Sequence, residues 1–338
     1  MRDTHAMRDP SFWWRNAGIE SAALAPVAAI YGAVAGHRMG RKGHAPGVPV
    51  ICVGNLTVGG AGKTPTALAI GRILIGAGRR VVFLSRGYGG TANTAMRVDP
   101  MKHRAAEVGD EPMLLARLAP TIVSADRVAG AEMARAAGAS VIVMDDGFQN
   151  SSLQKTLSLV VVDGRRGIGN GRVIPAGPMR APLRTQIRHA DALLILGTPS
   201  PQCESAIDAA MARGIPVLHG QLEAEADAVS ALTGHRVLAF AGIGDPGKFF
   251  STVAEAGISA PVTEKFPDHH RYTRAEAEAL VDRAARESLV LVTTEKDLVR
   301  IAGDPEVAAL SKVARALPAT LQFDDEDVLR RLLFGKAG

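Results

Sequence analysis

The sequence predicts an α/β fold with two domains, each built on a parallel sheet. Short apolar runs alternate with helical stretches from residue 48 onward, which indicates βαβ units. A glycine-rich turn separates the first of these runs from the first helical stretch, a place where α/β proteins bind anions. The length of 338 residues suits two domains of ordinary size better than one.

The composition limits the classes of protein that remain. At 47% hydrophobic and 22% charged residues, the chain is neither disordered nor fibrous. Its two cysteines, Cys52 and Cys203, have no metal or redox spacing, which excludes a disulfide framework and favours a reducing compartment. The net charge of +5 favours an acidic partner, namely nucleic acid, anionic lipid or a phosphorylated substrate. A merely basic soluble protein is the alternative.

Residues 1–47 are expected to form an amphipathic N-terminus that associates with a membrane. Trp13 and Trp14 precede an alanine-rich apolar run, and a basic flank follows it. The run is shorter than the roughly 20 apolar residues that span a bilayer, and no signal-peptide cleavage point is evident. Aromatic rings beside a weakly apolar helix suit the membrane interface, whereas a helix packed on the domain is the alternative. Either Met1 or Met7 can be the start.

The expected elements follow from apolar runs that end at turn signals. The first domain, 48–150, has strands at 48–55, 80–90 and 140–149 and helices at 64–78 and 110–119. The second, 151–303, has strands at 157–164, 192–196, 216–219, 236–241 and 289–293. The segment 304–338 is expected to be a helical tail, with a strand at 320–323, that packs back on the first domain.

The stretch "VGNLTVGGAGKTPTA" predicts a nucleotide site and hence a P-loop NTPase-like first domain. The general pattern G-x-x-x-x-G-K-[ST] fails, because Thr57 stands at the first glycine. The physical parts are nevertheless present: flexible backbone amides, a lysine for the β- and γ-phosphates, and a hydroxyl for Mg²⁺. An ordinary glycine-rich turn is the alternative. The expected nucleotide-binding residues are Thr57, Val58, Gly59, Gly60, Ala61, Gly62, Lys63 and Thr64.

A second metal element is expected where an apolar strand ends in acid, at Asp145 and Asp146. ATP is favoured over GTP, because the nearest guanine-reading stretch, "TTEKD" at 293–297, has the wrong spacing. Two further groups are weaker signals on their own. Asp110 and Glu111 suit either helix capping or a base near the γ-phosphate. The sequence "PDHH" at 267–270 suits either a tuned proton acceptor or an ordinary surface.

An acid-free stretch between Asp163 and Asp191 carries six arginines in a Gly- and Pro-rich sequence. Arginines on such a loop suit bidentate contacts to phosphate and therefore an anionic acceptor. No aromatic residue lies among them, so a single-stranded nucleic-acid platform is not expected. A solvated basic surface is the alternative.

Together these motifs resemble the tetraacyldisaccharide 4′-kinase family over nearly the whole chain. The resemblance rests on "RDPSFWW", "VGNLTVGGAGKTP", "LSRGYGG", "GDEP", "DDGFQ", "GNGRVIPAGPMR", "FPDHHRYT" and "LVTTEKD", in this order. The family's loop reads T-V-G-G-x-G-K-T, so Thr57 matches it. The resemblance implies transfer of the ATP γ-phosphate to the 4′-hydroxyl of tetraacyldisaccharide 1-phosphate, giving lipid IVA. It also implies Mg²⁺ and a peripheral enzyme on the cytoplasmic face of a Gram-negative inner membrane, with no nucleic acid and no inferable protein partner.

Site residues follow from the resemblance position by position. Asp110 is the implied base, with His269 as its partner and Asp268 behind it, and Lys63 acts on the phosphates. The implied metal residues are Thr64, Asp145, Asp146 and Glu111. The implied substrate residues are Arg86, Tyr88, Gly89, Asn170, Arg172 and Arg180. In one departure, Ala181 stands where the resemblance implies an acid.

Two other functions fit parts of the sequence. The loop also suits an ATP-dependent metallochaperone or a ligase-like P-loop protein, which needs neither an aromatic, apolar N-terminus nor the arginine stretch. A membrane-associated binding module without catalysis leaves the pairing of the GKT loop with Asp145 and Asp146 unexplained.

Overall fold

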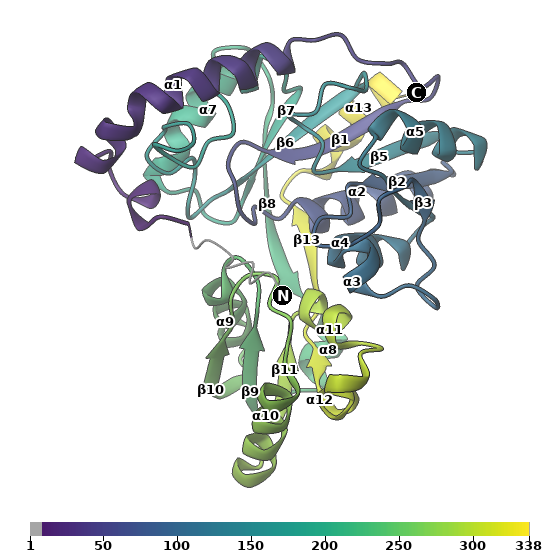
Figure 1. The fold of residues 1–338 in the computed structure, drawn as a ribbon, viewed down its shortest axis with the longest axis vertical. Coiled ribbons are helices and arrows are strands. Elements are labelled where there is room, and N and C mark those ends of the chain that lie inside the picture. The colour runs from purple at the N-terminus through teal and green to yellow at the C-terminus, as the bar shows by residue number, and fades with distance from the viewer. Residues whose placement is uncertain (1–8, 338) are drawn as a thin grey trace.

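The computed structural model describes residues 9–337 and contains two β-sheets, one above the other in Figure 1. The question of Met1 or Met7 as the start lies outside these residues. The larger sheet has nine strands in the order β13-β8-β7-β6-β1-β5-β2-β4-β3, and the smaller has four in the order β10-β9-β11-β12. Parallel pairing dominates both sheets, as the alternation of strands and helices predicts.

In the nine-stranded sheet, antiparallel pairs occur only at the two edges, between β13 and β8 and between β3 and β4. The inner strands are buried along their whole length, which fits their unbroken apolar sequences. The strands are β1 (Val50–Asn55), β2 (Val81–Ser85), β3 (Met96–Arg97), β4 (Thr121–Val123), β5 (Val141–Asp145), β6 (Leu157–Asp163), β7 (Ala192–Leu196), β8 (Val217–Ala224) and β13 (Ala319–Phe323).

Helices cover both faces of this sheet (Figure 1). One face packs against α5 (Arg127–Ala136), α6 (Leu183–Arg188) and α7 (Glu204–Met211), with the long α1 (Ile19–Met39) laid outside them. The other face packs against α2 (Lys63–Gly76), α4 (Asp110–Ala116) and α13 (Glu326–Ala337). Shorter elements are η1 (Ser11–Trp14), α3 (Ala105–Val108) and η2 (Pro201–Cys203).

The four-stranded sheet is all parallel and also has helices on both faces. Its strands are β9 (Arg236–Ala241), β10 (Ser259–Lys265), β11 (Val290–Thr293) and β12 (Arg315–Ala316). One face packs against α10 (Arg274–Glu287), α11 (Glu295–Ile301), η3 (Pro305–Val307) and α12 (Ala308–Val313), and the other against α8 (Ala226–Ser230) and α9 (Pro246–Glu255).

The pairing of the strands does not follow the boundary expected at residue 150. β6 pairs with β1, so β6, β7 and β8 extend the first sheet, and the change of sheet comes between β8 and β9. Within 304–337, β13 matches the strand expected at 320–323, and β12 is a further strand in the segment expected to be a helical tail. Its last helix does return to the larger sheet, where Leu329 and Leu333 are fully buried beside β1 and β6.

Candidate active site

The glycine-rich loop joins β1 to α2 and has the backbone that an anion site needs. Gly62, directly before the helix, has a φ of +86°, and a Cβ there would lie 2.3 Å from Leu196 Cδ1. Only glycine meets both conditions without strain. Lys63 and Thr64 then open α2, where the first backbone N–H groups have no intrahelical acceptors. The loop therefore offers amides and a lysine together to a phosphate.

Thr57 lies where the loop meets the arginine-rich segment. Its carbonyl accepts a hydrogen bond from Arg180 Nε at 3.0 Å, and the next amide, of Val58, donates to Pro178 O at 2.9 Å. The backbone at Thr57 is not left-handed. Glycine is therefore not required at this position, which explains how the general pattern fails while the loop is intact.

Asp146 forms ion pairs with two cationic side chains, Lys63 of the phosphate loop and Arg180 of the arginine-rich segment. Lys63 Nζ lies 3.7 Å from its Oδ2, and Arg180 Nη1 donates to its Oδ1 at 3.1 Å. Burial opposes ionisation of Asp146, but Lys63 and Arg180 outweigh it and hold its pKa below the usual value. Burial in turn lowers the pKa of Lys63, against the pull of Asp146. Position 181 holds a fully buried alanine in place of the expected acid, and Arg180 is instead oriented by the Asp146 carboxylate and the Thr57 carbonyl.

Asp145 and Thr64 form a buried pair that fits a magnesium ion. The Thr64 hydroxyl donates to Asp145 Oδ2 at 3.0 Å, and burial raises the pKa of this carboxyl to about 6. Asp145 Oδ1 is buried and has no hydrogen-bond partner among the described residues. Within residues 9–337 there is no cluster of three His, Cys, Asp or Glu side chains suited to a metal. A Mg²⁺ site does not require such a cluster, because proteins usually bind Mg²⁺ through one or two carboxylates together with water and substrate phosphates.

Asp110 and His269, 159 residues apart, come into direct contact. His269 Nδ1 lies 3.0 Å from Asp110 Oδ2, and His269 Nε2 lies 3.9 Å from Asp268 Oδ1. The hydrogen bond with Asp110 raises the pKa of His269, and the charge of Asp268 adds to this despite partial burial. A carboxylate bonded to an imidazole is an arrangement that can accept a proton from an alcohol.

Glu111, the next residue, is paired with a lysine on α11, the helix that follows β11 of the four-stranded sheet. Lys296 Nζ donates to Glu111 Oε1 at 2.8 Å. Burial opposes ionisation of Glu111, but Lys296 outweighs it and lowers the pKa of this carboxyl to about 2. The charge of Glu111 also contributes to the raised pKa of Asp145, which links the Asp110 region to the phosphate loop.

The expected substrate residues separate into two groups. The Tyr88 ring stands 5.3 Å from the His269 ring, edge to face, and Gly89 and the exposed Arg86 belong to the same loop. Asn170 instead ties the arginine-rich segment to the N-terminus, because its Nδ2 donates to Phe12 O and Ala176 O. Arg172 is exposed on that segment.

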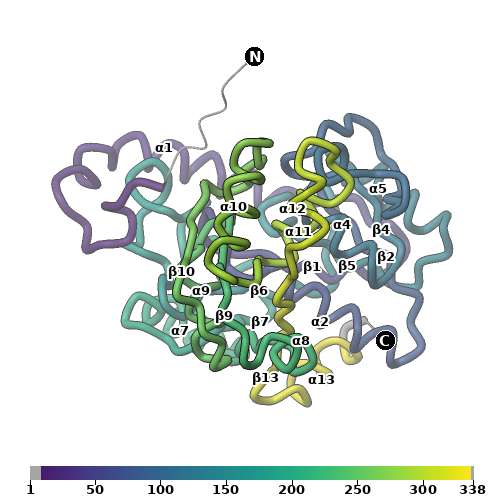
Figure 2. The backbone as a smooth tube through the Cα atoms, turned by 90° about the horizontal axis from the view of Figure 1, so that it is seen from below, coloured from purple at the N-terminus to yellow at the C-terminus, as the bar shows by residue number. Residues whose placement is uncertain are grey.

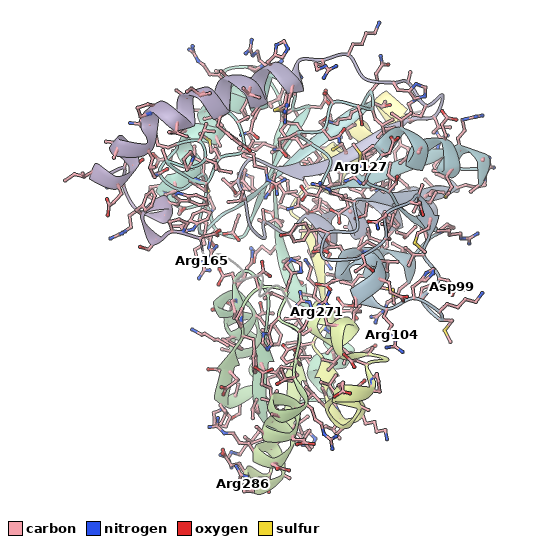
Figure 3. The ribbon with its side chains drawn as sticks, in the orientation of Figure 1. Asp99, Arg104, Arg127, Arg165, Arg271 and Arg286 are labelled. Atoms are coloured by element: carbon pink, nitrogen blue, oxygen red, sulfur yellow. The ribbon has the colours of Figure 1, made fainter. Side chains whose placement is uncertain are left out.

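Three basic residues at the site have no place among the sequence predictions. Arg127, in the core of the nine-stranded half (Figure 3), donates to Ser124 O at 2.6 Å and lies beside the backbone of Asp146. Lys296 and Arg300 come from α11, which lies beside α4 (Figure 2). The sequence signal for Lys296 lies in the "TTEKD" run, whose spacing does not fit guanine recognition.

Comparisons with known proteins agree with one another. The family model described as tetraacyldisaccharide-1-P 4′-kinase matches residues 20–337. A tetraacyldisaccharide 4′-kinase of Rhodopseudomonas palustris (strain BisA53) is 52% identical over 98% of this chain and 96% of its own length. One from Methylobacterium sp. (strain 4-46) is 52% identical over 98% and 100%. The crystal structure of LpxK from Aquifex aeolicus in complex with ATP matches with a TM-score of 0.73 and 28% identity, over 94% of this chain and 99% of that one.

Proposed function

Because the chain belongs to the tetraacyldisaccharide 4′-kinase family, it is a phosphotransferase, and we propose which of its residues carry out the transfer. The enzyme transfers the γ-phosphate of ATP to the 4′-hydroxyl of tetraacyldisaccharide 1-phosphate and forms lipid IVA in lipid A biosynthesis. One observation supports the assignment most directly: the phosphate loop and the His269 loop meet. Gly244, in the loop after β9, lies against both loops. A Cβ added to Gly244 would be 3.2 Å from Asp268 Oδ2 and 3.6 Å from the backbone N of Gly60 in the phosphate loop.

Lys63 and the loop amides bind the phosphates of ATP in this proposal. They oppose the negative charge that spreads over the γ-phosphoryl group as its bond to the β,γ-bridging oxygen breaks. Thr64 and Asp145 would hold Mg²⁺, with Asp146 and Glu111 close by, and the ion would supply further positive charge to the phosphates. The unpaired Oδ1 of Asp145 and its contact with Thr64 support this role.

Asp110 is the base. As the 4′-oxygen forms its bond to the γ-phosphorus, Asp110 takes the hydroxyl proton, and ADP leaves with the bridging oxygen. His269, bonded to Asp110, helps to hold that proton, and Asp268 orients the ring from its other side. Arg86, Tyr88 and Gly89 contact the disaccharide, since their loop lies next to His269. Arg172 and Arg180 belong to the basic segment that faces the substrate phosphate. Asn170 holds this segment in place through its hydrogen bond to Ala176 O.

The helix α1 holds the enzyme on the cytoplasmic surface of the inner membrane. It has 21 residues, and a window of 18 of them has a mean hydropathy of 1.4, which by length and composition alone is enough to cross a bilayer. One face packs on the protein, since Gly32 lies against Pro182 and Val173. The opposite face exposes large apolar side chains, which are Ile19, Val27, Ile30, Tyr31 and Val34. A helix with one packed and one exposed apolar face suits peripheral attachment.

A labelled phosphate assay tests this function. The purified enzyme is incubated with γ-labelled ATP, Mg²⁺ and tetraacyldisaccharide 1-phosphate, and label is expected in the lipid. Lys63→Ala is expected to lose both ATP affinity and turnover, by at least about tenfold in kcat/KM, because it removes the cation nearest the phosphates. Full ATP affinity and turnover in this variant would contradict the role of Lys63.

A further inference from the structure

The helix α11 brings two cations from the four-stranded sheet to the two acids that begin α4. Thr294 caps α11 by accepting a hydrogen bond from Asp297 N. Residues four apart lie on one face of a helix, so Lys296 and Arg300 point together toward α4. Lys296 pairs with Glu111, and Arg300 pairs with Asp110. No part of the proposed function uses Arg300.

Arg300 and His269 share one oxygen of Asp110. Arg300 Nε donates to Asp110 Oδ2 at 2.6 Å, and Arg300 Nη2 lies 2.6 Å from the same atom. His269 Nδ1 lies 3.0 Å from it. The side chains of Arg300 and Asp110 are only 7% and 9% exposed, so water screens this pair little. Both contacts use Oδ2 of Asp110, and neither uses Oδ1.

Arg300 is itself fixed by a buried carboxylate. Asp297 is fully buried, and its Oδ1 accepts from Arg300 Nη1 at 2.8 Å, from Tyr272 OH at 2.9 Å and from Gly242 N at 3.1 Å. The carbonyl of Gly242 accepts from both Arg300 Nη1 and the His269 backbone N–H. One peptide unit after β9 thus sets the positions of both groups that hold Asp110.

We propose that Arg300 is a positioning residue for the base: it locks Oδ2 of Asp110 in place and leaves Oδ1 to accept the proton of the sugar hydroxyl. This inference rests on the proposed role of Asp110. Because Arg300 and His269 both belong to the four-stranded half and Asp110 to the nine-stranded half, the base is completed only where the two halves meet. The effect of Arg300 therefore falls on turnover, not on ATP binding.

Three full-length variants test the proposal: Arg300→Met, Arg300→Lys and the control Arg283→Met. Arg283 forms ion pairs with Glu264 and Glu287 in the same half of the molecule, away from Asp110. Arg300→Met is expected to lower kcat about tenfold or more while the KM for ATP stays within about twofold. Arg300→Lys keeps the charge but not the fork of donors, so its kcat should fall between those of wild type and Arg300→Met.

Equal kcat for Arg300→Met and Arg283→Met, or a loss confined to KM, overturns the proposal. If Arg300→Met fails to fold, Arg300→Lys decides: a lowered kcat with an unchanged ATP KM supports positioning, and a wild-type kcat overturns it. Wild type and Asp110→Ala are assayed beside them. Absence of labelled lipid from wild type would contradict the proposed function itself, whereas an active wild type, an inactive Asp110→Ala and an intact Arg300→Met would contradict only the role of Arg300.

Discussion

Asp145 is a residue whose place in the site costs stability. Burial raises its pKa from 3.8 to about 6, so in the unfolded chain it ionises at a lower pH than in the folded protein. Folding is therefore opposed by this residue as the pH rises above the unfolded value, by up to about 3 kcal/mol once the pH exceeds the folded one. Such a carboxylate makes sense where a cation is to be bound.

We expect Asp145→Asn to be more stable than wild type at pH 8 in the absence of Mg²⁺, by up to about 3 kcal/mol, and inactive. At pH 4 the difference should nearly vanish, because Asp145 is then protonated in the folded state. Urea unfolding at the two pH values measures this difference, with substitution of the exposed Asp282, Asp282→Asn, as the control for a lost surface charge. A loss of stability at both pH values would contradict the prediction.

His269 has the opposite sign of effect. Its pKa is raised in the folded protein, chiefly by the hydrogen bond with Asp110, so its protonated form stabilises the fold. That stability is fully present below the unfolded pKa of about 6.5 and is lost as the pH rises through the higher folded value.

We therefore expect His269→Gln to destabilise the protein more at pH 6 than at pH 9. Denaturant unfolding of both proteins at several pH values gives the difference in the free energy of unfolding. The charged groups that influence the pKa of His269 are Asp110, Asp268, Glu111 and Arg300. Asp110 has the largest effect, so Asp110→Asn should remove most of the pH dependence. A difference that does not change with pH would show that the hydrogen bond adds nothing to the pKa of His269.

At the scale of single elements, α1 carries the membrane prediction. Val34 on α1 and Val313 on α12 are both 48% exposed, so they form a matched pair on two faces of the molecule. We expect Val34→Glu to reduce co-sedimentation with anionic vesicles severalfold, because a carboxylate would enter the apolar and negatively charged interface. Val313→Glu should bind as wild type does. Equal binding by both variants, at unchanged melting temperature, would exclude the exposed face of α1 as the contact.

Local sequence predicts which segments form strands and helices, but not how the strands pair. Apolar runs bounded by turns identified the buried strands, since strand and helix periods are local properties. The choice of sheet that each strand joins depends instead on residues far away in the sequence. Helices alternate with strands in the same way on either side of residue 150, so nothing near β6 in the sequence indicates that it pairs with β1. Asn170 is a similar case, because its polar side chain suits a substrate as well as the carbonyls it bonds.

For the whole molecule, the site divides into parts that motifs reveal and parts that only tertiary contacts reveal. Lys63, Thr64 and Asp145 lie in a loop and at a strand end that short sequence motifs identify. Lys296 and Arg300 act on acids 185 and 190 residues away, and no spacing rule connects such distances. The site draws on both halves of the molecule, as Figures 1 and 2 show for α4 and α11.

Ion pairs also join the two halves at positions other than Asp110. Lys248 on α9 lies 3.1 Å from Asp163 at the end of β6, and Arg165, at the junction in Figure 3, contacts Asp245 at the start of α9. Part of the arginine-rich segment is thus occupied within the protein rather than by a ligand. Contacts of this kind hold α9 and the loop after β9 close to the phosphate loop.

The pairing of β13 with β8 has a consequence for the nascent chain during translation. The four-stranded half is an excursion that leaves the larger sheet after β8 and rejoins it at β13. Until residues 319–337 have been synthesised, the edge of β8 has no partner, and the apolar face that Leu321, Leu329 and Leu333 cover stays open. From the synthesis of β8 until the synthesis of β13, the nascent chain therefore carries an unpaired strand edge, a kind of surface that promotes aggregation.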